Sequence, residues 1–245
     1  QRQKSTRHKE FISKRRNVMP YKKIVAFGDS FTRGDELADC DIVREPNCRY
    51  SLSTWPAILA GLLEADYECF ATGGRGNQWI SWMVTSNILT YKDCLFVINW
   101  TYFGRFDFLN QDDWWDTATP NNNDKSFYQK IDSDVWNLLR NLQIIYTTVC
   151  LLEQNNVNFI MTCQDSIFNQ TFNQLRPKAK VGGNWTRTLN LLQAHVIQKI
   201  QTFEGLPFRE WAAKHGYAIG THGHPLEKAH AEAAKYINTH VIEGI

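Results

Sequence analysis

The feature that most constrains the fold is an alternation of short apolar runs with longer segments of helical periodicity. The apolar runs predict strands at 22–28, 66–71, 94–100 and 157–162, with a last short strand at 216–220. The remaining segments predict helices near 53–65, 77–89, 131–154, 186–203, 207–215 and 225–242. Strands that alternate with helices form a mainly parallel sheet that is covered on both faces. We therefore expect a single three-layer α/β/α domain over residues 20–245, flavodoxin-like, with about five strands.

The charge of the chain is distributed unevenly. Of 27 Lys/Arg and 25 Asp/Glu, residues 1–18 hold seven and one, so the rest of the chain holds 20 and 24. We expect residues 1–19 to be a basic, flexible tail. Nucleic-acid binding through this tail is the alternative, and we favour the flexible tail over it. Met19 is an alternative start, in which case the tail would not belong to the natural protein.

Composition excludes several classes of protein. No apolar run approaches the ~20 residues that cross a bilayer, and no apolar stretch follows the basic N-terminus as it does in a signal peptide. The six cysteines contain no CxxC pair, so we expect no metal site, and nothing implies an organic cofactor. Cys40 and Cys48 share a polar loop and could pair in an oxidising compartment, but we favour reduced thiols.

A Gly-Asp-Ser turn, Gly28-Asp29-Ser30, ends the first predicted strand. The carboxyl ends of parallel strands meet at one edge of the sheet, where functional sites form. Ser30 would lie there among backbone N–H groups, but a serine needs a base to act as a nucleophile. His224, which precedes Pro225 at the start of the last predicted helix, is the candidate base. The alternative is a tight turn at 28–30 and a histidine that only caps a helix or lies on the surface.

Four stretches together resemble the SGNH hydrolases, the GDSL esterase/lipase superfamily. They read FGDSFTRGDEL (27–37), ATGGRGN (71–77), VINWTYFGR (97–105) and THGHP (221–225). The resemblance extends over residues 22–240 and implies Ser30 as nucleophile, with His224 as base. It also implies an oxyanion hole built from the backbone N–H groups of Ser30 and Gly74, with Gly73 as the alternative glycine. The GDSF and GDEL pair, with a tryptophan after the third strand, is similar to phage-encoded members; we favour a cytoplasmic or virion-associated protein over a secreted one.

Two positions depart from the family pattern. Thr221 stands where the family places the acid that orients the base, so we expect a Ser30–His224 dyad unless an acid arrives from elsewhere in the fold. His222 is the second choice of base. The third stretch lies where the family has the motif Gly-x-Asn-Asp. Asn99 occupies the position of the glycine in that motif, and Thr101 occupies the position of the asparagine.

Either the Asn99 amide or the Thr101 hydroxyl is expected to complete the oxyanion hole. The alternative for Asn99 is a strand-end residue that satisfies backbone groups.

The loop that follows Ser30 contains two further acids, Asp35 and Glu36. They could pair with Arg33 or Arg105, but we favour a solvated loop. Asp29 is a structural residue of the turn in the family that the motifs resemble, and we expect the same here.

Residues 100–116 are rich in aromatic side chains. Trp100 and Tyr102 are candidates for lining an acyl pocket or stacking on a sugar. Arg105 is a candidate for holding a carboxylate or phosphate of a substrate. The alternative, which we favour for the rings, is a small core within the loop itself.

The sequence thus predicts a serine esterase that acts on a small-molecule or carbohydrate ester, with O-acetyl groups on a carbohydrate as one candidate, and without a membrane partner. An acyltransferase would share the same residues. The alternative from another class is a weakened or inactive, virion-associated binding or assembly module. An acid within reach of His224 would favour the enzyme, and a large distance between Ser30 and His224 would favour the module. Neither the oligomeric state nor the acyl group can be predicted.

Overall fold

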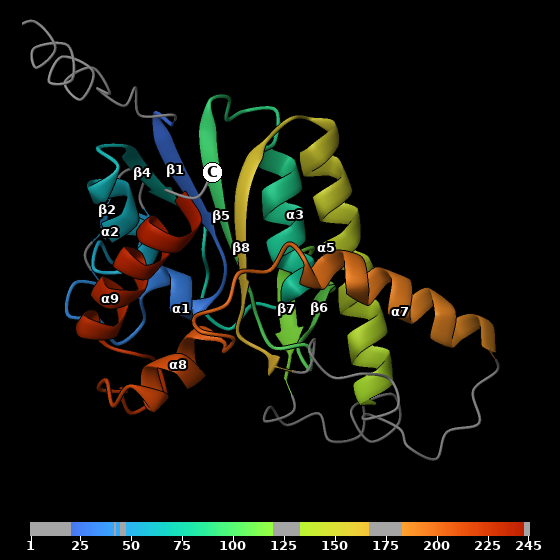
Figure 1. The fold of residues 1–245 in the computed structure, drawn as a ribbon. Coiled ribbons are helices and arrows are strands. Elements are labelled where there is room, and N and C mark those ends of the chain that lie inside the picture. The colour runs from blue at the N-terminus through green and yellow to red at the C-terminus, as the bar shows by residue number, and fades with distance from the viewer. Residues whose placement is uncertain (1–20, 42, 45–47, 120–132, 167–182, 243–245) are drawn as a thin grey trace, which may run out of the picture.

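A computed structural model describes residues 21–41, 43–44, 48–119, 133–166 and 183–242 of the chain. Its central sheet has four parallel strands in the order β4-β1-β5-β8 (Figure 1). Their bounds are Asp66–Cys69 for β4, Lys23–Phe27 for β1, Cys94–Trp100 for β5 and Asn158–Cys163 for β8. The predicted α/β/α fold with a parallel sheet is confirmed. The predicted basic tail, residues 1–19, lies outside the described residues.

The fifth predicted strand, 216–220, is not formed. One isolated bridge from Ile219 to Pro225 is all that this segment contributes. At the free edge of β8, Ile200 makes one parallel bridge with Met161, and the Gln201 N–H donates to the Met161 carbonyl at 2.7 Å. The chain follows β8 only briefly there, so the sheet ends at four strands.

Helices cover both faces of the sheet (Figure 1). α2 (Trp55–Leu62), α8 (Phe208–Lys214) and α9 (Glu227–Ile237) share one apolar core with the sheet. α3 (Asn77–Asn87), α5 (Asp134–Gln154) and α7 (Gly183–Ile197) share the other. β5 lies between two strands and is buried at all seven residues. Because each face of a parallel strand is covered by helices, such a strand is apolar throughout, which explains the run at 94–100.

Two antiparallel hairpins accompany the sheet and were not predicted. They are β2 (Val43–Arg44) with β3 (Cys48–Arg49), and β6 (Phe106–Leu109) with β7 (Trp115–Ala118). The second hairpin begins within the aromatic segment 100–116 and ends at Ala118. The rings of that segment are divided: Trp100 and Phe103 are fully buried in the main core, whereas Trp114 is 74% exposed.

The remaining elements are short. α1 (Ser30–Arg33) follows β1, and a π-helical turn (Asn238–Ile242) follows α9. Cys40 is a free thiol, as are the four other cysteines whose surroundings the structure describes. None of the helices in the described part of the chain has the length and apolar composition needed to span a bilayer.

Candidate active site

The turn after β1 brings Ser30 to the carboxyl edge of the sheet. A side chain at Gly28 would meet the Thr32 hydroxyl at 2.2 Å, so glycine is required where the chain leaves the strand. Asp29 is the N-cap of α1, and its Oδ1 accepts a hydrogen bond from the Phe31 N–H at 3.1 Å. Ser30 is therefore the first residue of a helical turn, a position that leaves its backbone N–H free of helical hydrogen bonds.

The loop that precedes α9 brings His224 to Ser30. The His224 Nε2 lies 2.8 Å from the Ser30 Oγ, although the two residues are 194 positions apart in sequence. Backbone hydrogen bonds close this loop, with the Gly220 N–H donating to the His224 carbonyl at 2.8 Å. The imidazole packs against the Phe31 ring, with ring centroids 4.7 Å apart, and its side chain is 12% exposed. The predicted nucleophile and base are thus in hydrogen-bond contact.

An acid that sequence reasoning placed in solvent lies on the other side of the imidazole. The Glu36 Oε2 is 2.7 Å from the His224 Nδ1, and the Glu36 side chain is only 15% exposed. The expectation that Glu36 lies in a solvated loop is therefore wrong, and the exception attached to the expected dyad, an acid from elsewhere in the fold, applies. The neighbouring Asp35 forms the alternative ion pair considered for it, with its Oδ1 2.5 Å from the Arg33 Nε.

The loop 221–224 surrounds the Glu36 carboxylate with donors. The Thr221 hydroxyl and the His222 N–H both donate to Oε1 at 2.9 Å, and the His224 N–H donates to Oε2 at 3.3 Å. These hydrogen bonds, the one from the His222 N–H above all, lower the pKa of Glu36 to about 2. Thr221 therefore stands at the family acid's position but donates to an acid from another loop. His222 contributes its backbone N–H here and no contact with Ser30.

Glu36 is held in an uncommon backbone conformation. Its φ of 68° lies in the left-handed region, which non-glycine residues rarely adopt. Two residues further on, the Ala38 N–H donates to the Glu227 Oε1 in α9 at 3.1 Å, which ties the loop to the last helix. A side chain at Gly220 would come within 2.6 Å of the Glu36 carboxylate, so the carboxylate occupies space that only glycine leaves open.

On the opposite side of Ser30, the loop before α3 presents Gly74. Its φ is 78°, and neither its N–H nor the Ser30 N–H donates to another described residue. Asp107, from β6, fixes this loop because its carboxylate accepts from the Gly76 N–H at 2.7 Å and the Trp79 N–H at 2.9 Å. The two predicted oxyanion donors of the backbone are therefore available. The alternative, Gly73, packs its backbone against the Asp35 carboxylate.

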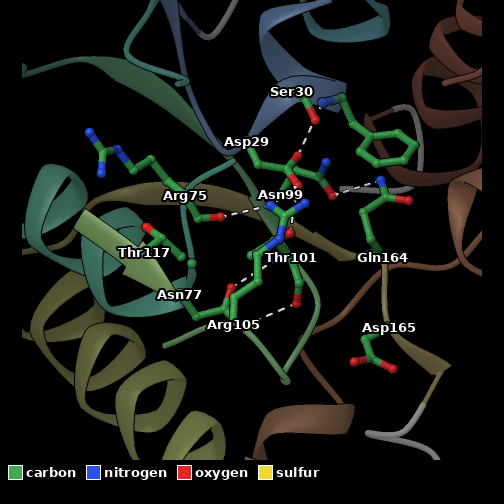
Figure 2. Close-up of polar contacts among 12 residues, drawn as sticks. Asp29, Ser30, Arg75, Asn77, Asn99, Thr101, Arg105, Thr117, Gln164 and Asp165 are labelled. Atoms are coloured by element: carbon green, nitrogen blue, oxygen red, sulfur yellow. Dashed lines mark hydrogen bonds and ion pairs between the residues drawn. The ribbon is translucent and has the colours of Figure 1, made fainter. Parts of the chain in front are cut away.

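Asn99 and Thr101, the side chains expected to complete the oxyanion hole, are both fully buried and are engaged elsewhere (Figure 2). The Thr101 hydroxyl donates to the Asp29 Oδ2 at 2.5 Å. The Asn99 Oδ1 accepts from the Thr162 hydroxyl at 2.9 Å and from the Gln164 Nε2 at 3.2 Å. The Asn99 Nδ2 is buried without a hydrogen-bond partner, and Asn99 is not among the residues that line the cavity.

Arg105 pairs with Asp29 and not with Asp35 or Glu36. Its Nη1 donates to the Asp29 Oδ2 at 2.9 Å and to the Arg75 carbonyl at 2.8 Å (Figure 2). The Asp29 carboxylate is fully buried and the Arg105 side chain is 16% exposed.

Of the two aromatic candidates for substrate binding, one lies in the core. Trp100 is fully buried and its Nε1–H donates to the Met161 Sδ at 3.2 Å, so it has no access to a substrate. Tyr102 borders the cavity, and burial raises the pKa of its hydroxyl against the opposing effect of a hydrogen bond from Arg209.

A cavity of about 710 Å³ opens over these residues. Its walls include the side chains or backbone of Ser30, Gly74, Tyr102, Arg105, Arg209 and His224. Nucleophile, base and oxyanion donors thus face one space of the size of small-molecule pockets. Within the described ranges, no three His, Cys, Asp or Glu side chains come together in a way that would hold a metal ion.

Comparison with known proteins gives matches among solved structures alone. No model of a known protein family matches the chain, and no curated protein does. Esterase EstA from Pseudoalteromonas sp. is 10% identical with a TM-score of 0.49, over 91% of this chain and 97% of that one. A lipolytic protein of the G-D-S-L family from Veillonella parvula is 12% identical with a TM-score of 0.44, over 91% and 99%.

A third match is the acetyl xylan esterase Est2A from Butyrivibrio proteoclasticus, at 17% identity and a TM-score of 0.47 over 89% of this chain and 64% of that one. One of these structures is described as a member of the G-D-S-L family, the group that the four sequence stretches resemble. At such identities and scores the similarity concerns the path of the chain and says nothing of its chemistry. That the chain is phage-encoded stays a prediction.

Proposed function

We propose that the protein is a serine ester hydrolase in which Ser30 is the nucleophile, His224 the general base and Glu36 the acid that orients the base. One observation carries this proposal: an unbroken chain of hydrogen bonds runs from the Ser30 Oγ through the imidazole to the Glu36 carboxylate, at the wall of an open cavity. A base held between a nucleophile and an acid is the arrangement that activates serine in hydrolases.

The two partners of His224 select its tautomer. Glu36 is ionised at neutral pH because its pKa is about 2, so its Oε2 accepts a hydrogen bond from the Nδ1–H, which keeps the proton on Nδ1. Nε2 then carries the lone pair that accepts the Ser30 hydroxyl proton. As the Oγ–carbon bond forms, that proton moves to Nε2 and the carbonyl π pair moves to the oxygen. The Ser30 and Gly74 N–H groups stabilise the resulting oxyanion.

Collapse of this tetrahedral intermediate breaks the bond to the alcohol, which leaves with the proton from the His224 Nε2. In the second half of the reaction His224 takes a proton from water, whose oxygen attacks the acyl carbon. The second intermediate collapses, the Ser30 oxygen recovers its proton, and a carboxylic acid is released. An alcohol in place of water would give acyl transfer by the same steps.

For the substrate, we propose an ester with a small acyl group, and an O-acetylated carbohydrate as its alcohol part. The Tyr102 ring at the cavity wall supports this choice, because aromatic side chains pack well against sugar faces. Hydrolysis of acetylated xylan and of 4-nitrophenyl acetate, butyrate and octanoate tests it. A preference for octanoate would overturn the small-acyl proposal.

The second candidate, an inactive binding module, receives less support. It was favoured by the absence of an acid at Thr221, and Glu36 removes that reason. A large distance between Ser30 and His224 would have favoured the module, whereas the two side chains are 2.8 Å apart, a contact that a chain without activity would not need to maintain.

Labelling with a fluorophosphonate probe, followed by peptide mapping, tests the proposed function. We expect labelling at Ser30 that disappears in Ser30→Ala and in His224→Ala, while circular dichroism shows that both variants are folded. Absence of labelling in folded wild-type protein would overturn the hydrolase proposal and favour the binding module.

A further inference from the structure

The oxyanion side of the site has fewer side-chain donors than its motif predicts. Thr101 donates its hydroxyl proton to Asp29, and Asn99 does not line the cavity. Two backbone N–H groups, from Ser30 and Gly74, are what remains of the expected set. An oxyanion hole with one donor removed typically loses about 100- to 1,000-fold in kcat, so a further donor would matter.

Arg105 is positioned between the two segments that carry those N–H groups. Its Nη1 donates to the carboxylate of Asp29, the residue before Ser30, and to the carbonyl of Arg75, the residue after Gly74. One guanidinium nitrogen therefore bridges both halves of the oxyanion hole (Figure 2).

The guanidinium also lies over the Tyr102 ring, with its Cζ 5.5 Å from the ring centroid, a contact that uses none of its N–H groups. Its Nε and Nη2 make no hydrogen bond with any described residue, and neither is enclosed in the protein interior. Arg105 borders the cavity together with Ser30 and Gly74. These N–H groups therefore border the cavity without a hydrogen-bond partner in the described part of the chain.

The loop that carries Arg105 is held rigidly. The Arg140 guanidinium donates to the Phe103 carbonyl at 3.0 Å and to the Arg105 carbonyl at 2.6 Å. The Asn141 amide also donates to the Phe103 carbonyl, at 3.0 Å. Such fixed donors stabilise developing charge without reorganising during the reaction.

We propose that Arg105 is a catalytic residue that supplies the third, charged donor of the oxyanion hole, in place of the neutral amide that the motif leads one to expect. The inference rests on the proposed hydrolase function. Asp29 balances the guanidinium charge in the resting enzyme, so the guanidinium stabilises a bound neutral ester only weakly. The guanidinium stabilises the negatively charged oxygen of the tetrahedral intermediate more strongly. An interaction that is stronger in the transition state than with the bound substrate raises kcat.

Arg105→Gln tests the proposal, with 4-nitrophenyl acetate as a neutral substrate. We expect kcat to fall about 100- to 1,000-fold with little change in KM. Affinity for an arylboronic acid, whose adduct with Ser30 is a tetrahedral anion, should fall by a similar factor. The matched control is Arg33→Gln, which removes a charge from α1, close to Ser30, at a side chain that pairs with Asp35 and does not border the cavity, and it should change kcat less than about threefold.

The outcomes separate this inference from the function on which it rests. A wild-type protein that is not labelled by fluorophosphonate overturns both. A labelled wild type, together with an Arg105→Gln variant that keeps kcat and boronate affinity within about threefold, overturns the role of Arg105 alone. Equal losses in Arg105→Gln and Arg33→Gln would also overturn it, because the summed positive charge near Ser30 would then explain the effect.

Loss of Arg105 leaves the buried Asp29 carboxylate without its cation, so the variant could fail to fold. Nitrogen-15 NMR of the wild-type guanidinium groups avoids this difficulty. We expect the boronic acid to move the Arg105 Nε–H resonance downfield and to slow its exchange with water. An unchanged Arg105 resonance in the saturated adduct would contradict direct contact with the oxyanion.

Discussion

Two sides of Ser30 differ in how each departs from the SGNH pattern: the acid side, which contains His224 and Glu36, and the oxyanion side, which contains Gly74, Thr101 and Arg105. On the acid side, Glu36 comes from a loop 188 residues before His224 and fills the place beside the imidazole completely, with four hydrogen bonds. On the oxyanion side, the candidate replacement, Arg105, lies in the same loop as the residue it would replace. A site can therefore keep its geometry while its side chains come from different parts of the chain.

The largest effect is expected from Glu36→Gln. The amide carries no negative charge to stabilise the imidazolium, and its NH₂ group can donate to Nδ1 and favour the wrong tautomer, so kcat should fall about 10³- to 10⁴-fold. Steady-state hydrolysis of 4-nitrophenyl acetate at pH 8 measures it. Asp35→Asn is the matched control, because Asp35 is the adjacent acid and does not contact His224. A loss below tenfold in Glu36→Gln would show that the acid side does not need its charge.

A smaller effect is expected when Glu36 is displaced rather than neutralised. In Gly220→Ala the new methyl group would come within 2.6 Å of the carboxylate, whose flexible side chain can move away. We expect kcat to fall ~10- to 100-fold, since small misplacements of catalytic groups have effects of this size, while the thermal unfolding midpoint stays within ~2 °C. Gly61→Ala, where nothing lies within 4 Å of the new methyl group, is the control. Equal activities would mean that the position of Glu36 is not critical.

A second histidine, His230, should make the stability of the protein depend on pH. His230 is buried in α9, accepts from the Trp55 N–H at 3.0 Å, and has its pKa lowered to about 3 by burial. Between the unfolded pKa of about 6.5 and that value, the unfolded state binds the extra proton. The free energy of unfolding should therefore fall with decreasing pH by about 1.4 kcal/mol per pH unit in this window.

Urea unfolding at pH 7 and at pH 5 measures this slope. In His230→Gln, whose amide oxygen can still accept from Trp55, the contribution should disappear. Glu36 adds a loss in the same direction only below pH 4.5, because its pKa is lowered from 4.5 to about 2. An unchanged slope in the variant between pH 7 and pH 5 would assign the pH dependence to other groups.

The smallest effect on activity is expected from Asn99→Ala, on the oxyanion side. Asn99 does not line the cavity, so kcat should stay within about threefold. Stability should decrease by ~1–3 kcal/mol, because the buried Thr162 hydroxyl and Gln164 amide lose their acceptor. A 100-fold decrease in kcat without loss of stability would instead identify Asn99 as an oxyanion donor and remove the need for Arg105.

The parts of the fold that could be predicted from sequence are those governed by local pattern. β5 was predicted at its observed bounds because a strand covered on both faces is an apolar run. The β6–β7 hairpin was missed because Asp107 and Asp116 interrupt its apolar residues and the aromatic rings suggested a loop. The prediction of a fifth strand was wrong because 216–220 has the residue pattern of a short strand but no neighbouring strand to pair with.

The site shows the same limit. Ser30, Gly74 and His224 could be located because each lies in a short motif at a strand or helix end. Glu36 could not, since its role depends on a contact between loops at opposite ends of the sequence. The missing acid at Thr221 was the available signal: it indicated that another acid should be sought among the loops at the carboxyl edge of the sheet.

The positions of the three residues in the chain have a consequence for synthesis. Ser30 and Glu36 are made together, and the base follows 188 residues after Glu36. If the three residues act as proposed, a growing chain contains its nucleophile and acid for almost the whole of translation but receives its base only near the end. Synthesis of the C-terminal end would then be the activation step, because a chain that stops before His224 contains the sequence of all four strands and lacks the proposed base.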